Sequence, residues 1–383
     1  MQTATHQCVK NCPICDNLGS PLRRKLKIYV RAFDGIVASE FSVCAACDFA
    51  FMVNPFDDET MADYYRKNDQ IRRDEMSAEE ELHTSNQVRF LSENMGDRNI
   101  ETMLEVGADN GAFLKIAQKK LGIRCYFDEL NEVACSILSA NGFLDANKMD
   151  AKDRRFDVIV VRHVLEHIVF PAHYLEELKK RMSPGGLVFV EVPDCTSIDM
   201  NETDTFCLEH VNYFSLASMC RLMNRAGYSI VAYESSRTEG YGTTSNRVLR
   251  ILMEANPHSK NTCDQGSDAW DNLLNKALKY YDAIDSLFLK NKGKRTAFYG
   301  AGTHTLMFLA NTSVGLPPVI YDKDPKKIGT ELHGSKIVDA ETITDSDADI
   351  LIVMVTSYKK EVRAFLEQKG ISKEKTYFLT QMA

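Results

Sequence analysis

The chain has no apolar run of the roughly 18–20 residues that a helix needs to cross a bilayer. Residues 1–10 also lack the apolar stretch of a secretory signal peptide. Positive charge is not in excess either, because 54 acidic residues outnumber 46 basic ones and the formal net charge is −8. These absences predict a cytoplasmic protein without a membrane or nucleic-acid partner.

Cysteine, in contrast, is plentiful, with 11 residues. Without a secretory signal, they indicate a reducing compartment in which thiols bind metal or lie buried. Four of them form two C-x-x-C pairs, Cys12 with Cys15 and Cys44 with Cys47. Each pair can turn two sulfurs towards one ion, so we predict a structural zinc site with four thiolate ligands. Coincidental cysteines or a redox pair are the alternatives, and Cys8 could replace one ligand.

Alternating apolar runs and helical patterns predict an α/β protein with parallel sheets. A length of 383 residues suggests two or three domains. A polar stretch around Pro257 predicts a linker between them. The strands are expected at 102–106, 124–127, 156–161, 187–192, 229–234, 247–253, 295–299, 319–321, 350–355 and 376–379, with an N-terminal hairpin at 27–31 and 36–41. The helices are expected at 61–65, 78–91, 112–120, 132–140, 171–182, 216–226 and 270–291.

A glycine loop follows the first strand of the alternating region and reads E-x-G-x-x-x-G. Gly107 lets the backbone turn sharply, and Gly111 allows a close approach where the next helix begins. The free amides of that helix can bind the methionine carboxylate of S-adenosylmethionine (SAM). Glu105 and Asp109 suit its ammonium group. The spacing differs from the G-x-G-x-x-G of nicotinamide-binding proteins, and a plain glycine turn with surface acids is the alternative.

Acidic residues follow the next two strands. A carboxylate about 20 residues after the loop can accept hydrogen bonds from both ribose hydroxyls. Glu129 is the first choice for this position and Asp128 the second. Asp150 is placed to meet the adenine amino group. Together with the loop, these acids predict a complete binding site for SAM.

The fourth-strand segment 156–168 reads FDVIVVRHVLEHI, and Ser-Pro-Gly-Gly follows at 183–186. This pattern resembles the class I SAM-dependent methyltransferases, where FDxIxxxxVLEH is followed by a helix, a PGG turn and the fifth strand. The resemblance implies a Rossmann-like fold with SAM as the cofactor and Arg162 in the cofactor pocket. His163 and His167 are expected to pack against that pocket rather than act in catalysis.

Segment 209–215 reads EHVNYFS and leads into a helix with Ser215 as its N-cap. With the C-x-x-C pairs before it and an α/β domain behind it, the layout resembles the zinc-containing sugar C-methyltransferases, which act on nucleotide-linked keto-deoxysugars. The resemblance implies that His210 is the general base and Glu209 its partner. A histidine that titrates near neutrality can take the proton next to a ketone. Expected acceptor contacts nearby are Tyr65, Asn212 and Tyr213.

The chain also departs from this family. Cys207 and Leu208 replace the tyrosine and histidine that precede its E-H pair, and segment 241–246 replaces its H-G-G-S motif. The methylated atom, carbon, oxygen or nitrogen, therefore stays open. An O- or N-methyltransferase of a natural product on the same scaffold is the second interpretation. A degenerate methyltransferase fold that serves as a binding module is the third.

A second glycine turn, at 300–302, follows the strand predicted at 295–299. Its amides can attract phosphate, but the third glycine of a dinucleotide motif is missing. In the resembling family the C-terminal domain helps to close the substrate cleft. Gly302, Thr303 and His304 are therefore expected to face the nucleotide or sugar of the acceptor, and a structural lid is the alternative.

We therefore expect an N-terminal zinc-binding unit (1–70), a SAM-binding methyltransferase domain (71–255), a linker with a connecting helix (256–294) and a C-terminal α/β domain (295–383) that closes the substrate cleft. The expected acceptor is a small molecule, a nucleotide-linked sugar or a similar polar compound. The protein is expected to be a monomer or a homodimer.

Overall fold

The computed structural model describes residues 11–15, 22–32, 35–67, 78–150, 154–195, 209–237, 247–262, 269–356 and 358–382. The chain forms two compact units. The first comprises Met1–Arg23, Ser42–Ser197 and Glu209–Gly266, and the second Arg24–Phe41, Ile198–Leu208 and Ser267–Ala383. Within these described ranges, no helix has the length and apolar character of a membrane span.

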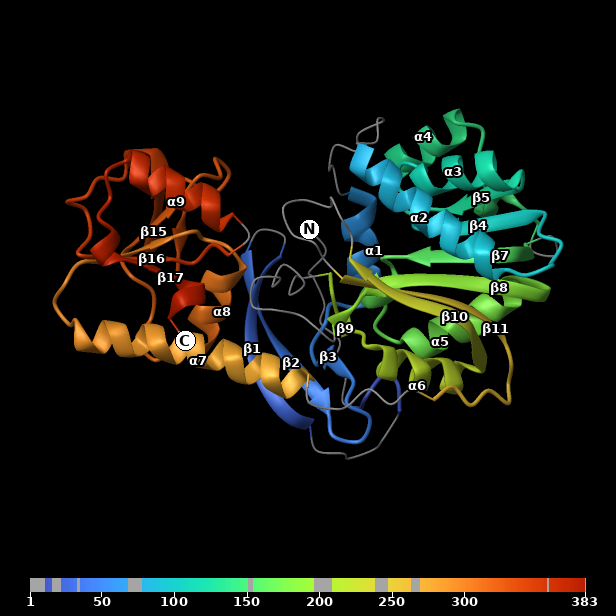
Figure 1. The fold of residues 1–383 in the computed structure, drawn as a ribbon, viewed down its shortest axis with the longest axis horizontal. Helices are drawn as coiled ribbons and strands as arrows, with labels where there is room; N and C mark the ends of the chain where they lie inside the picture. Colours follow the sequence, from blue (N-terminus) through green and yellow to red (C-terminus); the bar gives the residue numbers. More distant parts are fainter. Residues whose placement is uncertain are drawn as a thin grey trace. The chain divides into compact units, whose positions relative to one another are not determined.

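A small sheet brings the N-terminal segment next to the segment that carries the predicted base (Figure 1). Its strand order is β1 (Leu22–Ala32), β2 (Gly35–Cys44), β3 (Ala50–Met52) and β9 (Asn212–Tyr213). Strands β1 and β2 confirm the predicted N-terminal hairpin. Strands β3 and β9 run antiparallel, and this long-range pairing was not predicted. Helices α1 (Asp58–Lys67) and α2 (Ala78–Asn94) follow β3 in the chain.

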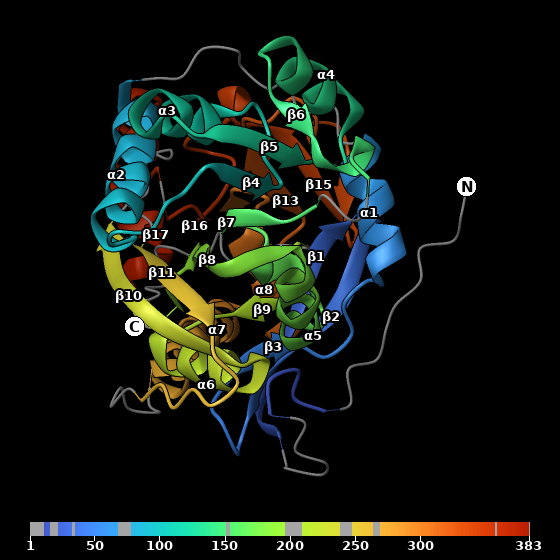
Figure 2. The same cartoon turned by 90° about the vertical axis from the view of Figure 1, so that its right-hand side faces the viewer.

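The first unit is built on a seven-stranded sheet with the order β10-β11-β8-β7-β4-β5-β6. Strands β8, β7, β4, β5 and β6 are parallel, and β10 and β11 add an antiparallel edge. Helices cover both faces of this sheet (Figure 2), and the central strands are accordingly rich in apolar residues on both faces. The strand bounds are β4 Thr102–Val106, β5 Arg124–Asp128, β6 Leu144–Asp145, β7 Phe156–Arg162, β8 Met182–Pro193, β10 Tyr228–Arg237 and β11 Arg247–Ala255.

The helices of this unit are α3 (Ala112–Leu121), α4 (Glu132–Ala140), α5 (Pro171–Leu178) and α6 (Leu216–Ala226). Side chains of α2 and α3 form one apolar cluster with the sheet. Helix α6 begins where expected, because Ser215 and Ser218 form a reciprocal capping box. The predicted Ser-Pro-Gly-Gly turn is instead the start of β8, where the pairing with β7 shifts register.

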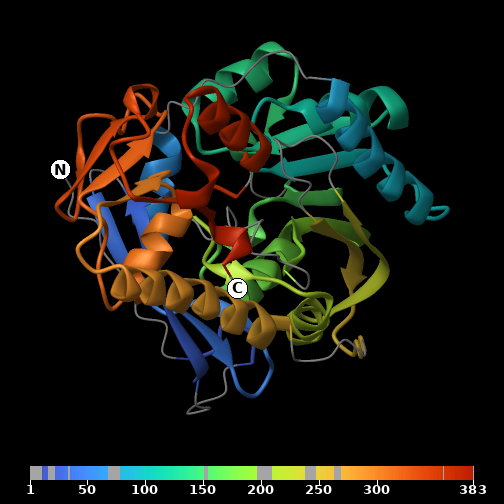
Figure 3. The same ribbon diagram turned by 60° about the vertical axis from the view of Figure 1, so that its left-hand side comes forward.

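The second unit contains a six-stranded sheet in the order β14-β15-β13-β12-β16-β17 (Figure 3). Its strands are parallel except β14. The predicted strands at 295–299, 319–321, 350–355 and 376–379 are present, and β14 and β15, which follow β13 without an α-helix between them, were not predicted. Strand β12 lies between β13 and β16, which makes the end of β12 the switch point where such sheets bind ligands. The bounds are α7 Ala269–Lys290, β12 Thr296–Tyr299, α8 Thr303–Asn311, β13 Val319–Asp322, β14 Glu331–Leu332, β15 Ser335–Asp339, β16 Ile350–Val353, α9 Lys359–Gln368 and β17 Thr376–Phe378.

Replacing Gly111 with alanine should destabilise the protein more than the same change at Gly122. Both glycines have positive φ, 75° and 69°, which costs other residues about 1–2 kcal/mol. A Cβ at Gly111 would lie 2.7 Å from Leu138 Cδ2, whereas nothing lies within 4 Å at Gly122. In urea unfolding we expect a loss of about 1 kcal/mol for Gly122→Ala and about 2–4 kcal/mol for Gly111→Ala. Equal losses would contradict this packing.

Candidate active site

The predicted cofactor loop lies at the carboxyl end of β4. Gly107 N–H donates to the Asp128 carbonyl (2.8 Å) and Gly111 N–H to the Ala108 carbonyl (2.9 Å). Gly107, Asp109 and Gly111 all have positive φ. This conformation favours glycine, which occupies two of the three positions. The loop thus folds back across the ends of β4 and β5 and leads into the N-terminus of α3.

Glu105 is the carboxylate of this loop that is buried most deeply, with an exposure of 0%. Its Oε1 accepts hydrogen bonds from Arg162 Nε (2.8 Å) and Nη2 (2.6 Å). Its Oε2 is buried and has no hydrogen-bond partner among the described residues. Burial raises the pKa of Glu105 to about 7 despite the neighbouring Arg162 charge. An ammonium group, or a water that bridges to it, would satisfy this oxygen, so the residue fits the SAM amino group.

Arg162 is committed to protein partners. Its guanidinium lies 4.6 Å above the ring of Phe113, and its Nη1 donates to Gln87 Oε1 at 2.9 Å. These contacts hold Arg162 against Glu105. Its contribution to a cofactor pocket would therefore be to compensate the charge of Glu105.

The two acids that follow β5 have different surroundings. Glu129 Oε2 accepts the Asp109 backbone N–H (3.0 Å), and its Oε1 accepts the N–H groups of Leu130 and Asn131. Asp128 is paired with Arg181 at 2.6 Å. Oε2 of Glu129 keeps a lone pair for a hydroxyl, whereas Asp128 is already paired with an arginine. This difference favours Glu129 as the ribose ligand. Asp150 is exposed.

A buried hydrogen-bond network lies next to this loop and was not predicted. Glu191 Oε1 on β8 accepts from Gln87 Nε2 (2.6 Å) and lies 3.1 Å from His163 Nε2. The other ring nitrogen of His163 lies 3.2 Å from Glu166 Oε1. The side chain of His163 is 45% exposed, and its hydrogen bonds to the two buried carboxylates raise its pKa to about 10. His163 also has φ of 50°, so the network holds a conformation that is otherwise uncommon.

The predicted base lies beside a second histidine. The rings of His210 and His167 are 5.1 Å apart, and His167 Nδ1 lies 2.8 Å from the carbonyl of Glu209. The Glu209 carboxylate accepts a hydrogen bond from Tyr64 at 2.8 Å. Tyr65, a predicted acceptor contact, packs edge-on against His167 at 5.9 Å. Helix α1, the end of β7 and the segment before β9 therefore meet around His210.

The other two predicted acceptor contacts in this region are buried in β9. Asn212 is 3% exposed, and its side-chain amide donates to the Ile168 carbonyl. Tyr213 is 0% exposed. Both residues connect β9 to its surroundings, and their contact with an acceptor stays a prediction.

The four predicted zinc ligands come together in the first unit. Cys12 Sγ lies 3.4 Å from Cys47 Sγ, and Cys15 Sγ lies 3.7 Å from Cys44 Sγ. All four sulfurs lie within 4.8 Å of one another. Tetrahedral coordination with Zn–S bonds of about 2.3 Å requires sulfurs about 3.8 Å apart, so the cluster fits a structural zinc ion. Cys8 lies outside the described residues.

Two arginines of α6 connect this cysteine cluster to the helices of the first unit. Arg225 Nη1 donates to the Ile14 carbonyl at 2.9 Å, and Arg221 Nη1 donates to the Cys47 carbonyl. A folded cysteine cluster therefore supports the helix that follows the predicted base. Cys207, Leu208 and segment 241–246, where the chain departs from the resembling family, lie outside the described residues.

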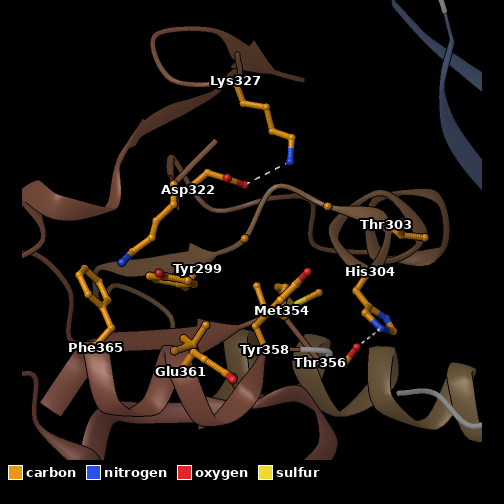
Figure 4. Close-up of a pocket in the computed structure, with 15 residues that line it drawn as sticks. Tyr299, Thr303, His304, Asp322, Lys327, Met354, Thr356, Tyr358, Glu361 and Phe365 are labelled. Carbon is orange, nitrogen blue, oxygen red and sulfur yellow. Dashed lines mark hydrogen bonds and ion pairs between the residues drawn. The ribbon is translucent and has the colours of Figure 1, made fainter. Parts of the chain in front are cut away.

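The second unit contains a cavity of about 530 Å³ at its switch point (Figure 4). Gly302, Thr303 and His304 line it, as do Lys323 and Lys327. A Cβ at Gly302 would meet nothing within 4 Å. No side chain caps the N-terminus of α8, which faces this cavity. Neither lysine belongs to a recognised sequence motif, so the sequence alone does not predict that they line a cavity.

Asp322 shapes the rim of this cavity. It accepts hydrogen bonds from the backbone N–H groups of Ala301 (2.7 Å) and Asp324 (2.8 Å). Lys327 Nζ lies 3.6 Å from Asp322 Oδ2. Figure 4 shows this pair on one side of the cavity and His304 directed towards Thr356 on the other.

Replacing Cys47 with serine should remove the bound zinc. A hydroxyl is a much weaker zinc ligand than a thiolate, so we expect zinc affinity to fall at least about tenfold. Mass spectrometry of the intact protein should give one zinc per wild-type chain and much less in Cys47→Ser. Cys195→Ser, a change at another buried cysteine, should keep its zinc. A wild-type protein that binds no zinc would contradict the assignment.

SAM affinity should rise with pH between 6 and 8 through Glu105. Below its pKa of about 7 this residue is largely protonated and cannot pair with an ammonium group. A single group with this pKa strengthens binding about tenfold over that range. In calorimetry, the SAM affinity of Glu105→Gln should not show this rise with pH, and the variant should bind SAM more weakly than wild type at pH 8. Glu101→Gln, at an exposed residue nearby, should behave as wild type, and an unchanged profile in Glu105→Gln would contradict the role.

Comparison with known proteins gives independent evidence. Residues 73–233 match the family described as a methyltransferase domain, and residues 294–377 match the family described as C2185-like, N-terminal. The C-methyltransferase NovU from Streptomyces niveus is 25% identical over 228 residues, with coverage of 55% of this chain and 54% of NovU. The chain thus spans about half the length of this curated relative.

Two solved structures align with part of the chain. An S-adenosylmethionine-dependent methyltransferase from Clostridium acetobutylicum has a TM-score of 0.35 and 10% identity, with coverage of 52% of this chain and 98% of its own. The plantazolicin methyltransferase BpumL, solved with SAH, has a TM-score of 0.35 and 11% identity, with coverage of 46% and 84%. The family match covers less than half of the chain, and within residues 73–233 it is a match to a methyltransferase domain.

Proposed function

We propose that the protein is a SAM-dependent methyltransferase of natural-product type and that its acceptor is a nucleotide-linked sugar. The observation that carries the proposal is the position of two sites at one edge of the seven-stranded sheet. The loop at Gly107 follows β4, Glu129 follows β5, and His167 follows β7. Parallel strands place their carboxyl ends at the same edge. Since His167 contacts Glu209, the base His210 belongs to that edge as well.

Each side of the proposed site has its own task. The loop amides and Glu105 bind the amino-acid part of SAM, with Asp109 nearby, and Glu129 binds its ribose. When bound, SAM supplies an electrophilic methyl group. His210 removes a proton from the acceptor, and Tyr64 and Glu209 lie beside it to orient the reacting group. The acceptor atom is then a carbon next to a ketone or a hydroxyl oxygen.

The cavity of the second unit supports a nucleotide-linked acceptor. Its uncapped α8 N-terminus presents amides that can bind phosphate oxygens. Lys323 and Lys327 line the same cavity, where Lys327 pairs with Asp322 and Asp324 and Lys323 pairs with Glu341. The open space at Gly302 lets a ligand approach the backbone. We propose that the nucleotide of the acceptor binds here, with Gly302, Thr303 and His304 as contacts.

His210→Ala should lose methyl transfer by about 10²–10⁴-fold, because general-base catalysis contributes on this scale. Its affinity for SAM should stay within a few-fold of wild type. The assay uses isotopically labelled SAM with a panel of keto-deoxysugar nucleotides and product detection by mass spectrometry. Proton exchange at the α-carbon in deuterated water distinguishes C- from O-methylation.

His173→Ala is the matched control, because His173 is an exposed histidine on α5 and should leave turnover unchanged. Equal activity of His210→Ala and wild type would remove the catalytic assignment. SAM binding without transfer to any acceptor of the panel would instead favour a different acceptor or a binding module.

A further inference from the structure

We propose that Glu166 is the carboxylate that positions His210 and stabilises its protonated ring. This inference rests on the function proposed above, in which His210 is the base. The sequence assigned the partner role to Glu209, the adjacent residue. The structure offers a different carboxylate from the end of β7.

The first argument is proximity from a buried position. The side chain of Glu166 is 1% exposed. One of its carboxylate oxygens and one ring nitrogen each of His167 and His210 lie within 4.8 Å of one another. Its Oε1 is near His163 at 3.2 Å, while Oε2 is buried with no hydrogen-bond partner among the described residues. A buried carboxylate oxygen of this kind is expected to have a cationic or hydrogen-bonding partner in the working enzyme.

The second argument is that the backbone fixes this geometry. Val211 N–H donates to the carbonyl of Glu166 at 2.9 Å. One residue on, the ring of His167 bonds the carbonyl of Glu209 at 2.8 Å. The residues on either side of His210 are thus bound to Glu166 and its neighbour. His210 cannot shift along Glu166 without breaking one of these two bonds.

The third argument is that one carboxylate oxygen of Glu209 is already bonded to another side chain. Its Oε1 accepts the hydroxyl hydrogen bond of Tyr64. Glu209 therefore fixes a phenol from α1, a group that suits the polar atoms of an acceptor. The division of roles is that Glu209 holds Tyr64 and Glu166 holds His210.

The surrounding charges keep Glu166 ionised. Burial alone would raise its pKa, but the His163 hydrogen bond and the charges of His167, His163 and His210 outweigh burial and lower the pKa to about 2. Behind His163, the carboxylate of Glu191 is paired with Arg250. Among the described residues, these charged groups face Glu166 from the segment after β7, from β8 and β11, and from the segment before β9.

The step that Glu166 assists is proton removal. The acceptor C–H or O–H bond breaks, its electron pair stays on the acceptor, and a new N–H bond forms on His210. When bound, SAM would supply the methyl group to the electron pair left on the acceptor, with its sulfide as the leaving group. His210 later releases its proton to solvent. Glu166 stays ionised throughout and forms no bond, so it is a positioning residue.

The test measures the pKa of His210 directly in the full-length, zinc-containing protein with ¹⁵N-labelled histidine. The His210 signal is assigned by its absence in His210→Gln. In Glu166→Gln we expect the His210 pKa to fall by about one pH unit or more. Glu166→Asp keeps the charge and should restore most of the shift. Glu176→Gln removes an exposed carboxylate on α5 and should leave the His210 pKa unchanged.

Turnover supplies a second measurement. In Glu166→Gln the acidic limb of the pH profile of kcat/KM should move to lower pH, together with the His210 pKa. We expect kcat to fall about tenfold or more and KM for SAM to stay unchanged. An unchanged His210 pKa in a folded Glu166→Gln protein would overturn the proposal. The NMR titration needs no acceptor, so failure to find an acceptor would affect the proposed function alone.

A divalent cation is the competing occupant of this cluster. Titration of the same labelled protein with Mn²⁺ distinguishes the two, because a bound paramagnetic ion broadens the signals of its ligands. Broadening of His167 and His210 at one equivalent of Mn²⁺, abolished in Glu166→Gln, would overturn the positioning role in favour of a metal site. Sharp signals at one equivalent support it.

Discussion

The buried carboxylate of Glu191 is the interaction on which the site depends. It lies on β8 directly opposite Arg250 of β11, and it also bonds Gln87 of α2 and His163, the residue after β7. A buried charge is tolerated only when its partners are in place. Four elements must therefore adopt their native arrangement together. The ends of β7 and β8, where the chemistry is proposed, are fixed by this requirement.

The network reaches both halves of the proposed reaction. On the cofactor side, Gln87 bonds Arg162, which bonds Glu105. On the acceptor side, His163 connects Glu191 to Glu166. A continuous series of hydrogen bonds therefore joins the carboxylate proposed to meet SAM and the carboxylate proposed to hold the base. Two oxygens of this series, Glu105 Oε2 and Glu166 Oε2, have no hydrogen-bond partner among the described residues, and they are the atoms proposed to meet SAM and the base.

Local signals made much of the fold predictable. Strand β4 and helix α6 have the predicted bounds. A short apolar run that ends at a glycine loop marks β4, and the capping residues Ser215 and Gly227 mark the two ends of α6. Strand β9 was missed, since two residues carry no pattern and its pairing with β3 spans the chain. Glu166 was missed for a similar reason. His163 and His167 are its neighbours in sequence, but His210 and Val211 come from a segment more than 40 residues away, and no local pattern predicts that approach.

The central claim is that SAM and the acceptor meet at the carboxyl edge of the seven-stranded sheet. A crystal structure of the full chain with S-adenosylhomocysteine tests it most directly. The account predicts the amino-acid part of the ligand at the loop between Gly107 and Gly111, its ribose on Glu129 and its sulfur on the side of His210. Crystals that stay empty at saturating ligand, or a sulfur separated from His210 by the sheet, would contradict it.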